Sequence, residues 1–437
     1  MTARPQSVQV QQDMPTSPPW SRATRLAFRF GLLYFGTFCC ATSLGGLYPM
    51  ERVDDTVGLE TVWPLRQITF WTAAHVFGAK LPLLYRNSGS DDKIFDWVLA
   101  FCLLVFAIVG TLIWSALDRH RENYVTLNKW FRLFVRIVLA SELLFFGMVK
   151  VIPNQMLFPS LSALLTPLGR LSHFSILWSS VGAVPAYEIF AGCAELLAGV
   201  LLLFHRTTML GALLAAADMV EVWTLNMTYD VPVKLYSFHM LLLALLLLAP
   251  ECRRLLDFAL RDRATGPSAQ PRLFSTRRAN RFALAAQITV GIWLLFMNTY
   301  SGLAMWRTRG NGRPKPPVYG IWDVNELTID GQLHSPMASD FSCWRRIVFD
   351  RPTLMSVQCA DESFERYGAS LNASARTIVL SKTRDPKWKA EFTFERVGQD
   401  ELVLSGTANH HALQVQLHRA ALQKFVLLEP SFHWVQE

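Results

Sequence analysis

Long apolar stretches separated by short polar loops fill the first 300 residues of this 437-residue chain. Each holds roughly the 20 apolar residues with which an α-helix crosses about 30 Å of hydrocarbon. Two further apolar segments, 63–84 and 158–168, are broken by charged residues or prolines, which favours helices lying at the membrane interface. The pattern predicts seven membrane-spanning helices, over residues 24–47, 94–117, 129–151, 184–204, 207–226, 233–250 and 281–301.

From residue 316 onward the hydrophobic pattern changes to the alternation of a half-buried β-strand, as in Leu413, Val415 and Leu417. Short turns separate the alternating segments, which is typical of an antiparallel meander, and closing a meander into a barrel removes its edges. Gly320-Ile-Trp322 resembles the G-x-W opening of lipocalins. The expected strands are 321–329, 344–350, 354–359, 376–381, 388–397, 401–407, 412–419 and 424–428.

The two patterns divide the chain into five parts. A polar N-terminus, expected to be disordered, precedes two membrane helices with an interfacial helix. A four-helix membrane bundle follows, then a basic loop with the last membrane helix and a linker, and finally the β-domain. The expected fold class is therefore an α-helical polytopic membrane protein with a C-terminal antiparallel β-barrel or lipocalin-like domain. The bounds of the five parts are 1–23, 24–128, 129–255, 256–315 and 316–437.

The composition is typical of a membrane protein, because 51% of the residues are hydrophobic and 17% are charged, against about a quarter charged in soluble proteins. The net charge of +8 is unevenly distributed. Residues 316–437 carry 12 basic and 15 acidic side chains, a balance of −3, so the preceding residues hold an excess of 11. Since this excess lies mainly in short loops between apolar stretches, it indicates membrane lipid as a partner and no nucleic acid.

Loop charge also predicts the orientation in the membrane. The N-terminus is basic, and loop 251–281 has eight arginines against three acidic residues. The alternate loops 152–180 and 227–232 carry only Arg170 and Asp230 as charged residues. We therefore expect a cytoplasmic N-terminus and an extracytoplasmic β-domain, although four basic residues follow the last span on the outer side.

The seven cysteines include no C-x-x-C and no Cys/His spacing typical of zinc, so no metal site is expected. Cys343 and Cys359 lie symmetrically about Arg351, where Asp350-Arg351-Pro352 turns the chain. They would face each other across a hairpin, and an extracytoplasmic compartment permits a disulfide. The pattern is equally consistent with two unpaired buried thiols.

Ionisable side chains inside the predicted spans are the main candidates for function, because each one costs several kcal/mol in hydrocarbon. With a rise of about 1.5 Å per residue, Glu142, Glu195 and Asp218 fall near the membrane midplane. Arg136 lies toward the cytoplasm, within reach of one of these carboxylates. The candidates nearer the outer side are Lys150, Glu188, Glu221, Asp230, Lys234 and His239.

Two interpretations of these candidate residues remain open. In the first, ion pairs lock a helix bundle, and small residues such as Gly147 and Gly192 let the helices approach closely. In the second, the residues line a polar pocket that opens outward and binds a quinone, a proton or a small solute. His239 favours the second interpretation, because an imidazole can titrate near neutral pH. The pattern assigns no catalytic group and leaves open whether the protein is an enzyme.

The order of several motifs resembles the DoxX-like family of integral membrane proteins. The core of the resemblance covers 129–255 and includes that family's first helix, second helix and basic turn. Further segments are similar to a longer subgroup that has extra helices and a C-terminal domain. The motifs are Arg136-Ile-Val-Leu-Ala, Gly147-Met-Val-Lys150, Glu195-Leu-Leu-Ala-Gly-Val-Leu-Leu-Leu-Phe-His-Arg206, Asn226-Met-Thr-Tyr-Asp230-Val-Pro-Val-Lys234, Pro250-Glu251 and Phe432-His-Trp-Val-Gln-Glu437.

The resemblance implies a DoxX-like four-helix bundle over 129–255 in the bacterial cytoplasmic (inner) membrane. Some members are linked to respiratory redox complexes, and DoxD-like proteins are subunits of thiosulfate:quinone oxidoreductase. By this resemblance we expect an accessory subunit of a quinone-linked membrane complex, with a redox-enzyme partner subunit. The sequence contains no haem ligand pair, Cys₄ cluster, flavin motif or dinucleotide loop, so a quinone or the partner would carry the electrons. The alternatives are a transporter or small-solute-binding protein, and a membrane scaffold without a ligand.

Overall fold

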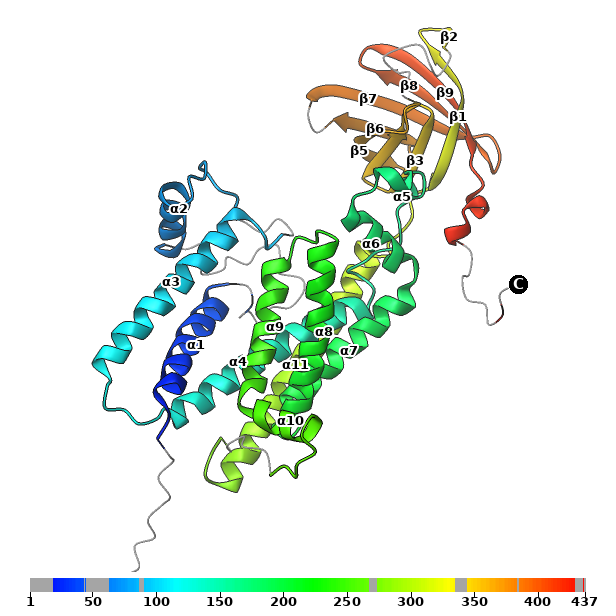
Figure 1. The fold of residues 1–437 in the computed structure, drawn as a ribbon. Helices are drawn as coiled ribbons and strands as arrows, with labels where there is room; N and C mark the ends of the chain where they lie inside the picture. Colours follow the sequence, from blue (N-terminus) through cyan, green and yellow to red (C-terminus); the bar gives the residue numbers. More distant parts are fainter. Residues whose placement is uncertain are drawn as a thin grey trace, which may run out of the picture. The chain divides into compact units, whose positions relative to one another are not determined.

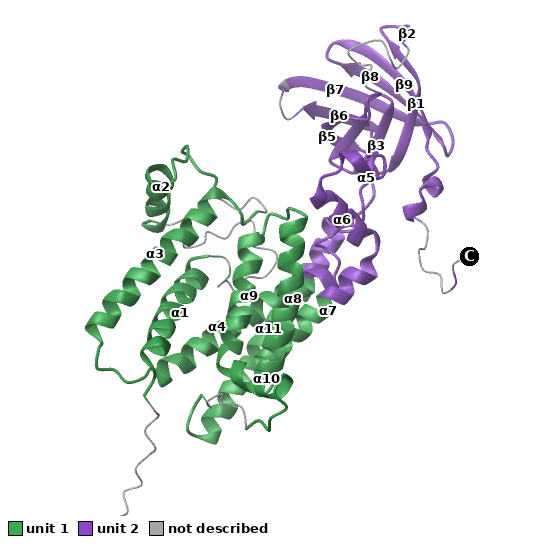
Figure 2. Cartoon of the chain, viewed as in Figure 1, with its two compact units in different colours: residues 1–148, 192–301 green, residues 149–191, 302–437 purple. Residues whose placement is uncertain are grey.

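The computed structural model describes residues 19–42, 44, 63–85, 90–266, 273–334, 344–382, 385–428 and 435. The chain forms two compact units, shown in different colours in Figure 2. Unit 1 comprises residues 1–148 and 192–301, and unit 2 comprises residues 149–191 and 302–437. The C-terminal motif that begins at Phe432 lies outside the described residues.

Unit 1 is helical, and its core is built from apolar side chains of helices that run through most of its length (Figure 1). Close contacts join α1 to α3, α2 to α3 and α8 to α9. Its helices are α1 (Arg22–Ala41), α2 (Leu65–His75), α3 (Ile94–Leu117), α8 (Thr208–Thr228), α9 (Lys234–Leu248), η5 (Ala249–Glu251), α10 (Cys252–Ala259) and the greater parts of α4 (Val125–Val151), α7 (Pro185–Leu203) and α11 (Arg277–Thr308).

Five helices in the described part of the chain are long and apolar enough to cross a membrane. They are α3, α7, α8, α11 and the continuous segment Lys234–Ala259, which begins with α9. The predicted helical membrane part is therefore confirmed. Helices α1 and α4 stand where the first and third spans are predicted, but arginines lower the hydropathy of α1, and α4 carries charges at intervals along its length.

Glycines set the closest approach between α4 and α7. A Cβ atom on Gly147 would lie 2.8 Å from the backbone nitrogen of Leu196 and 2.9 Å from the carbonyl oxygen of Gly192. A Cβ atom on Gly199 would lie 3.2 Å from the carbonyl oxygen of Ala140. The predicted close approach at small residues is confirmed, because any larger side chain at Gly147 would collide with the neighbouring backbone.

Unit 2 contains a closed antiparallel β-barrel, which confirms the predicted C-terminal domain (Figure 1). Each strand pairs with the next along the chain except for β2, which extends only β1, and the pairing of β1 with β9 closes the barrel. The strands are β1 (Gly320–Ile329), β2 (Gln332–His334), β3 (Arg346–Arg351), β4 (Leu354–Gln358), β5 (Phe364–Asn372), β6 (Thr377–Lys382), β7 (Asp385–Arg396), β8 (Glu401–Ala408) and β9 (His411–Arg419).

Large side chains fill the barrel interior. Trp322, Trp344, Phe349 and Phe392 are all fully buried and belong to one hydrophobic core. Trp322 is the tryptophan of the predicted G-x-W opening, and its indole nitrogen donates a hydrogen bond of 2.9 Å to the Val318 carbonyl oxygen. The interior is therefore a packed core of the kind that small barrels form.

The outer face of β1 and β3 is also covered. Ile321 and Val348 pack against Leu161 of the short helix α5 (Leu161–Leu164) in a separate small core. The Gln358 side chain donates to the carbonyl oxygen of Leu165 at 3.3 Å. The predicted interfacial piece 158–168 contains α5, which packs on β3 of the barrel within unit 2. The short helices η4 (Leu168–Arg170) and α6 (His173–Ala183) follow α5 in the chain.

Two strand predictions are corrected. Strand β5 (Phe364–Asn372) is missing from the prediction because Tyr367 is its only fully buried side chain, so the strand shows no hydrophobic alternation. The predicted strand 424–428 is wrong: these residues lie in the 3-10 turns η6 (Leu422–Lys424) and η7 (Val426–Leu428). Because β1 pairs with β9, residues 424–428 find no unpaired edge on β9, the strand that precedes them.

Cys359 at the end of β4 is disulfide-bonded. Its predicted partner, Cys343, lies outside the described residues. Thiols are free at the other five described cysteines: Cys39, Cys40, Cys102, Cys193 and Cys252.

Candidate functional site

The ionisable residues predicted inside the spans are mostly buried. Within unit 1 the relative exposure of Glu142, Glu195 and His239 is 5%, 1% and 2%. Lys150 and Glu188 are buried in unit 2. Those with hydrogen bonds or ion pairs to described residues include Glu142, His239, Lys234 and Glu188.

Glu142 of α4 forms a pair with Tyr236 of α9. The phenol hydroxyl donates a hydrogen bond of 2.5 Å to Oε2 of the carboxyl group. The ring of Phe146, one turn further along α4, meets the Tyr236 ring edge-on at 5.7 Å between centroids. The Tyr236 hydroxyl is thus the hydrogen-bond partner of this deeply buried carboxyl group, and the sequence did not predict it.

His239 lies between α9 and α1. Its Nδ1 is 2.7 Å from the Leu235 carbonyl oxygen, which only accepts hydrogen bonds, so Nδ1 carries the proton. In the neutral imidazole Nε2 is then an acceptor, and it receives the Tyr34 hydroxyl at 2.9 Å. The Phe38 ring stacks on the imidazole, with 3.7 Å between centroids and an interplanar angle of 1°.

Asp230 and Lys234 lie at the start of α9, where Lys234 Nζ is 2.8 Å from Asp230 Oδ1 and 3.6 Å from Asp92 Oδ2. Asp92 also accepts from the backbone nitrogens of Lys234 at 2.8 Å and Leu235 at 2.9 Å. These two N–H groups have no partner within the helix, so the carboxylate caps the N-terminus of α9. The arrangement is structural, and Asp92 is absent from the sequence prediction because it precedes α9 by more than 140 residues.

Glu188 of α7 binds backbone in unit 2. Its Oε1 accepts from the backbone nitrogens of Gln155 at 3.2 Å and Met156 at 3.0 Å. Its second oxygen, Oε2, is buried and has no hydrogen-bond partner among the described residues. Lys150, buried in the same unit, acts on Glu188 through its charge.

The other predicted carboxylates differ in exposure. Glu195 of α7 is buried, Asp218 of α8 is half-buried, and Glu221, also on α8, is exposed. Because Asp218 and Glu221 are three residues apart on one helix, their different exposure shows that the predicted polar face extends to the surface of unit 1.

Arg136 of α4 does not reach a carboxylate among the described residues, and this prediction is corrected. Its Nη1 donates to Thr208 Oγ1 at 3.3 Å and its Nη2 donates to the Gln287 side-chain oxygen. Glu142 is six positions away, about 9 Å along the helix axis, and its Oε2 accepts from Tyr236. Helix packing has thus given the arginine two neutral partners from α8 and α11.

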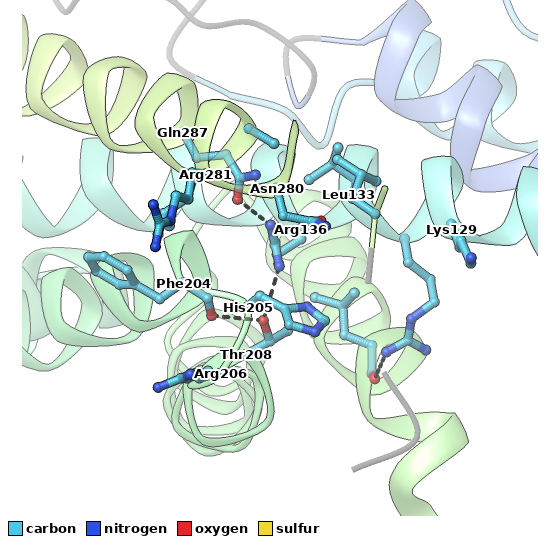
Figure 3. Close-up of a pocket in the computed structure, with 15 residues that line it drawn as sticks. Lys129, Leu133, Arg136, Phe204, His205, Arg206, Thr208, Asn280, Arg281 and Gln287 are labelled. Atoms are coloured by element: carbon cyan, nitrogen blue, oxygen red, sulfur yellow. Dashed lines mark hydrogen bonds between the residues drawn. The ribbon is translucent and has the colours of Figure 1, made fainter. Parts of the chain in front are cut away.

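Arg136 lies in a pocket of about 540 Å³ within unit 1, formed by α4, the turn between α7 and α8, the end of α9 and the start of α11 (Figure 3). Of the residues that line it, the sequence predicted only Arg136 as part of a polar pocket, and it gave no indication that basic residues of the neighbouring loops line the same cavity. Its ionisable lining residues are Lys129, Arg132, Arg136, His205, Arg206 and Arg281.

Among known proteins, the chain is 32% identical to YwoB of Bacillus subtilis (strain 168) over 121 residues, which cover 27% of this chain and 75% of YwoB. The chain belongs to the YwoB family. YwoB is described as an uncharacterized protein, so the YwoB relationship assigns neither a substrate nor a partner. No family model matches the chain, and no solved structure matches it.

Proposed function

We propose that this protein is a DoxX-like membrane protein that acts as an accessory subunit of a quinone-linked membrane redox complex. The observation that carries the proposal is the hydrogen bond between the half-buried Tyr34 and the buried His239, with the Phe38 ring stacked on the imidazole. A quinone ring needs an apolar, aromatic environment with a few placed hydrogen-bonding groups at its oxygens. The phenol of Tyr34 and Nε2 of His239 supply a donor and an acceptor in such an environment.

The chemistry of the pair fits a site that exchanges protons with a quinol. Nε2 of His239 is the acceptor, and Nδ1–H is held by the Leu235 carbonyl oxygen, which would stabilise the imidazolium after protonation. A quinol hydroxyl can replace the Tyr34 hydroxyl as the donor to Nε2. Because the sequence contains no motif for an electron carrier, the electrons would pass to a redox-enzyme partner subunit.

We also propose that the protein lies in the bacterial cytoplasmic membrane with its N-terminus inside and its barrel outside. The disulfide bond of Cys359 supports an oxidising compartment for the barrel. Protease added to intact spheroplasts is expected to cleave between the last membrane helix and the barrel. A barrel that becomes accessible only after lysis would contradict this orientation.

The test of the quinone proposal is native mass spectrometry and quinone extraction of the protein gently solubilised from its own membrane. We expect bound quinone and a co-purifying oxidoreductase subunit. His239→Gln and Tyr34→Phe are expected to lose at least tenfold in quinone content and electron transfer. The matched control is Tyr300→Phe, because Tyr300 is 61% exposed on α11.

Unchanged quinone content and electron transfer in both variants would refute the proposal. In that case solute uptake into vesicles by the purified protein alone would identify a transporter. A scaffold would show neither activity and would lose only stability in these variants. The filled barrel interior makes ligand capture inside the barrel the weaker alternative.

A further inference from the structure

The pocket of unit 1 that contains Arg136 has an unusual charge (Figure 3). Among the residues that the structure describes, its lining includes one lysine, four arginines and one histidine, and no aspartate or glutamate. These basic residues come from three places in the sequence: α4, the turn before α8 and the start of α11. The positive-inside pattern explains basic residues in loops, but it does not explain why they line one cavity.

Arg136 is the strongest sign of a ligand in this pocket. The side chain is 7% exposed, and its Nε has no hydrogen-bond partner in the described part of the chain. Its two terminal nitrogens donate to neutral oxygens, those of Thr208 and Gln287. A buried guanidinium that lacks an anion pays a large desolvation cost, so an anion bound in the pocket would stabilise it.

Arg132, one turn earlier on α4, is in a similar position. Its Nη2 donates to the Leu247 carbonyl oxygen at 3.1 Å, another neutral acceptor. The Glu251 carboxylate interacts electrostatically with Arg132. It also forms an ion pair with Arg254, with 3.3 Å between Oε2 of Glu251 and Nη1 of Arg254. Glu251 does not line the pocket. The cavity therefore retains a positive charge that the described side chains only partly balance.

We propose that this pocket binds a phosphate group, either the headgroup phosphate of an anionic lipid or free inorganic phosphate. Arginine presents several N–H donors in a planar fork that matches phosphate oxygens. Lys129, Arg206 and Arg281 add positive charge around the same cavity, whose volume of about 540 Å³ accommodates a phosphate group with its substituents. Basic pockets between membrane helices are suited to lipid headgroups. The site is separate from the Tyr34–His239 pair and does not depend on the proposed redox function.

The test measures the melting temperature of the full-length protein in neutral detergent. One arm compares sodium phosphate with sodium chloride at equal ionic strength, and the other compares added phosphatidylglycerol with phosphatidylcholine. A ligand that binds only the folded protein raises Tm by mass action, and we expect an increase of several degrees in at least one arm. An increase with phosphatidylglycerol alone identifies a lipid headgroup, and an increase with phosphate identifies a soluble anion.

Variants connect the effect to the pocket. Arg281→Gln, which changes an exposed side chain, and Arg136→Gln are each expected to reduce the increase in Tm by more than half. Arg278→Gln removes the same charge from the same helix outside the pocket and should leave the increase unchanged. If Arg136→Gln fails to fold, Arg281→Gln and Lys129→Gln decide the test. No increase in either arm, or an equal reduction in Arg278→Gln, would overturn the proposal.

Discussion

The hydroxyl group of Tyr236 donates a hydrogen bond of 2.5 Å to Oε2 of Glu142, and this contact joins α9 to α4 across 94 residues of sequence. Glu142 is 5% exposed, so water cannot replace the phenol if it is removed. Polar groups that are buried without a partner cost more than their hydrogen bond contributes. The pair therefore links the stability of the helical unit to one aromatic hydroxyl.

Removing that hydroxyl with Tyr236→Phe is expected to lower the free energy of unfolding by about 1–3 kcal/mol. Titration with a denaturing detergent, followed by circular dichroism, measures this change. Tyr300→Phe is the control, because Tyr300 is exposed on α11. If Tyr236→Phe is no more destabilising than Tyr300→Phe, the hydrogen bond does not contribute to stability. The double variant with Glu142→Gln should show non-additive losses.

A second buried arginine, Arg29, holds α1 in place. Its guanidinium donates to the Tyr124 hydroxyl at 2.6 Å, to Ser115 Oγ at 2.7 Å and to the Asp118 carbonyl oxygen at 2.8 Å. The Tyr124 hydroxyl in turn donates to Asp118 Oδ2 at 2.7 Å. These bonds connect α1 to the end of α3 and to the chain before α4.

Arg29→Met removes these hydrogen bonds but keeps an apolar stem, and we expect a loss of about 2–4 kcal/mol. Thermal unfolding in detergent, monitored by intrinsic tryptophan fluorescence, provides the measurement. Arg22→Met, at an exposed position of the same helix, should change Tm little. Arg29→Lys should recover only part of the loss, because an ammonium group cannot make the same forked contacts. Full recovery by lysine would show that only the charge matters.

Asp91, in the loop before α3, predicts a pH dependence of stability. Burial raises the pKa of its carboxyl group from 3.8 to about 6, with Asp96 and Asp92 adding to the rise and Lys93 opposing it. Between these two values the folded protein binds more protons at this site than the unfolded chain does. Its contribution to stability is therefore largest below the unfolded pKa and is lost as the pH rises through the folded pKa.

Asp91→Asn removes this loss, so the variant should have a higher Tm than the wild type at about pH 7 and a similar Tm at about pH 4. A series of melting curves across this range gives the difference at each pH. Glu122→Gln, at an exposed position before α4, should show a flat difference. A difference for Asp91→Asn that is also flat with pH would contradict the assignment.

Gly406 of β8 occupies a position in the barrel that has no room for a side chain. A Cβ atom there would lie 1.9 Å from the carbonyl oxygen of Glu391 and 2.7 Å from Cα of Phe392, both in β7. Gly406→Ala should therefore destabilise the barrel by about 1–3 kcal/mol or more, visible as faster cleavage by protease. Ser405→Ala at the adjacent exposed position is the control. Equal protease resistance of the two variants would show that β8 moves to accommodate the methyl group.

The sequence predicted those helices and strands whose hydrophobic pattern depends on their own residues alone. Alternation in Leu413, Val415 and Leu417 predicts β9 correctly, because successive side chains of a strand point to opposite faces. Strand β5 escaped prediction because its pairing with β4 and β6, and not its own hydrophobicity, makes it a strand. Residues 424–428 have the composition of a strand, but β9, the strand before them, is already paired on both sides, with β8 and β1.

For the candidate sites, the sequence identified buried ionisable groups but not their partners. Glu142 and His239 are buried as expected, yet Tyr236 and Tyr34 are the residues that bond to them. Arg136 was expected to meet a carboxylate and instead meets Thr208 and Gln287. A partner on another helix depends on how both helices are rotated and shifted, and local spacing carries no information about this.

The sequence by itself determined that the chain has apolar membrane helices followed by a β-domain, because hydrophobic length and period are local properties. It also determined that basic residues concentrate in particular loops. Only the tertiary structure decided that the barrel closes through β1 and β9, that an aromatic hydroxyl bonds to Glu142, and that basic residues from three segments line one cavity. These features depend on contacts between residues far apart in the chain, and such contacts are fixed only when the helices and strands pack.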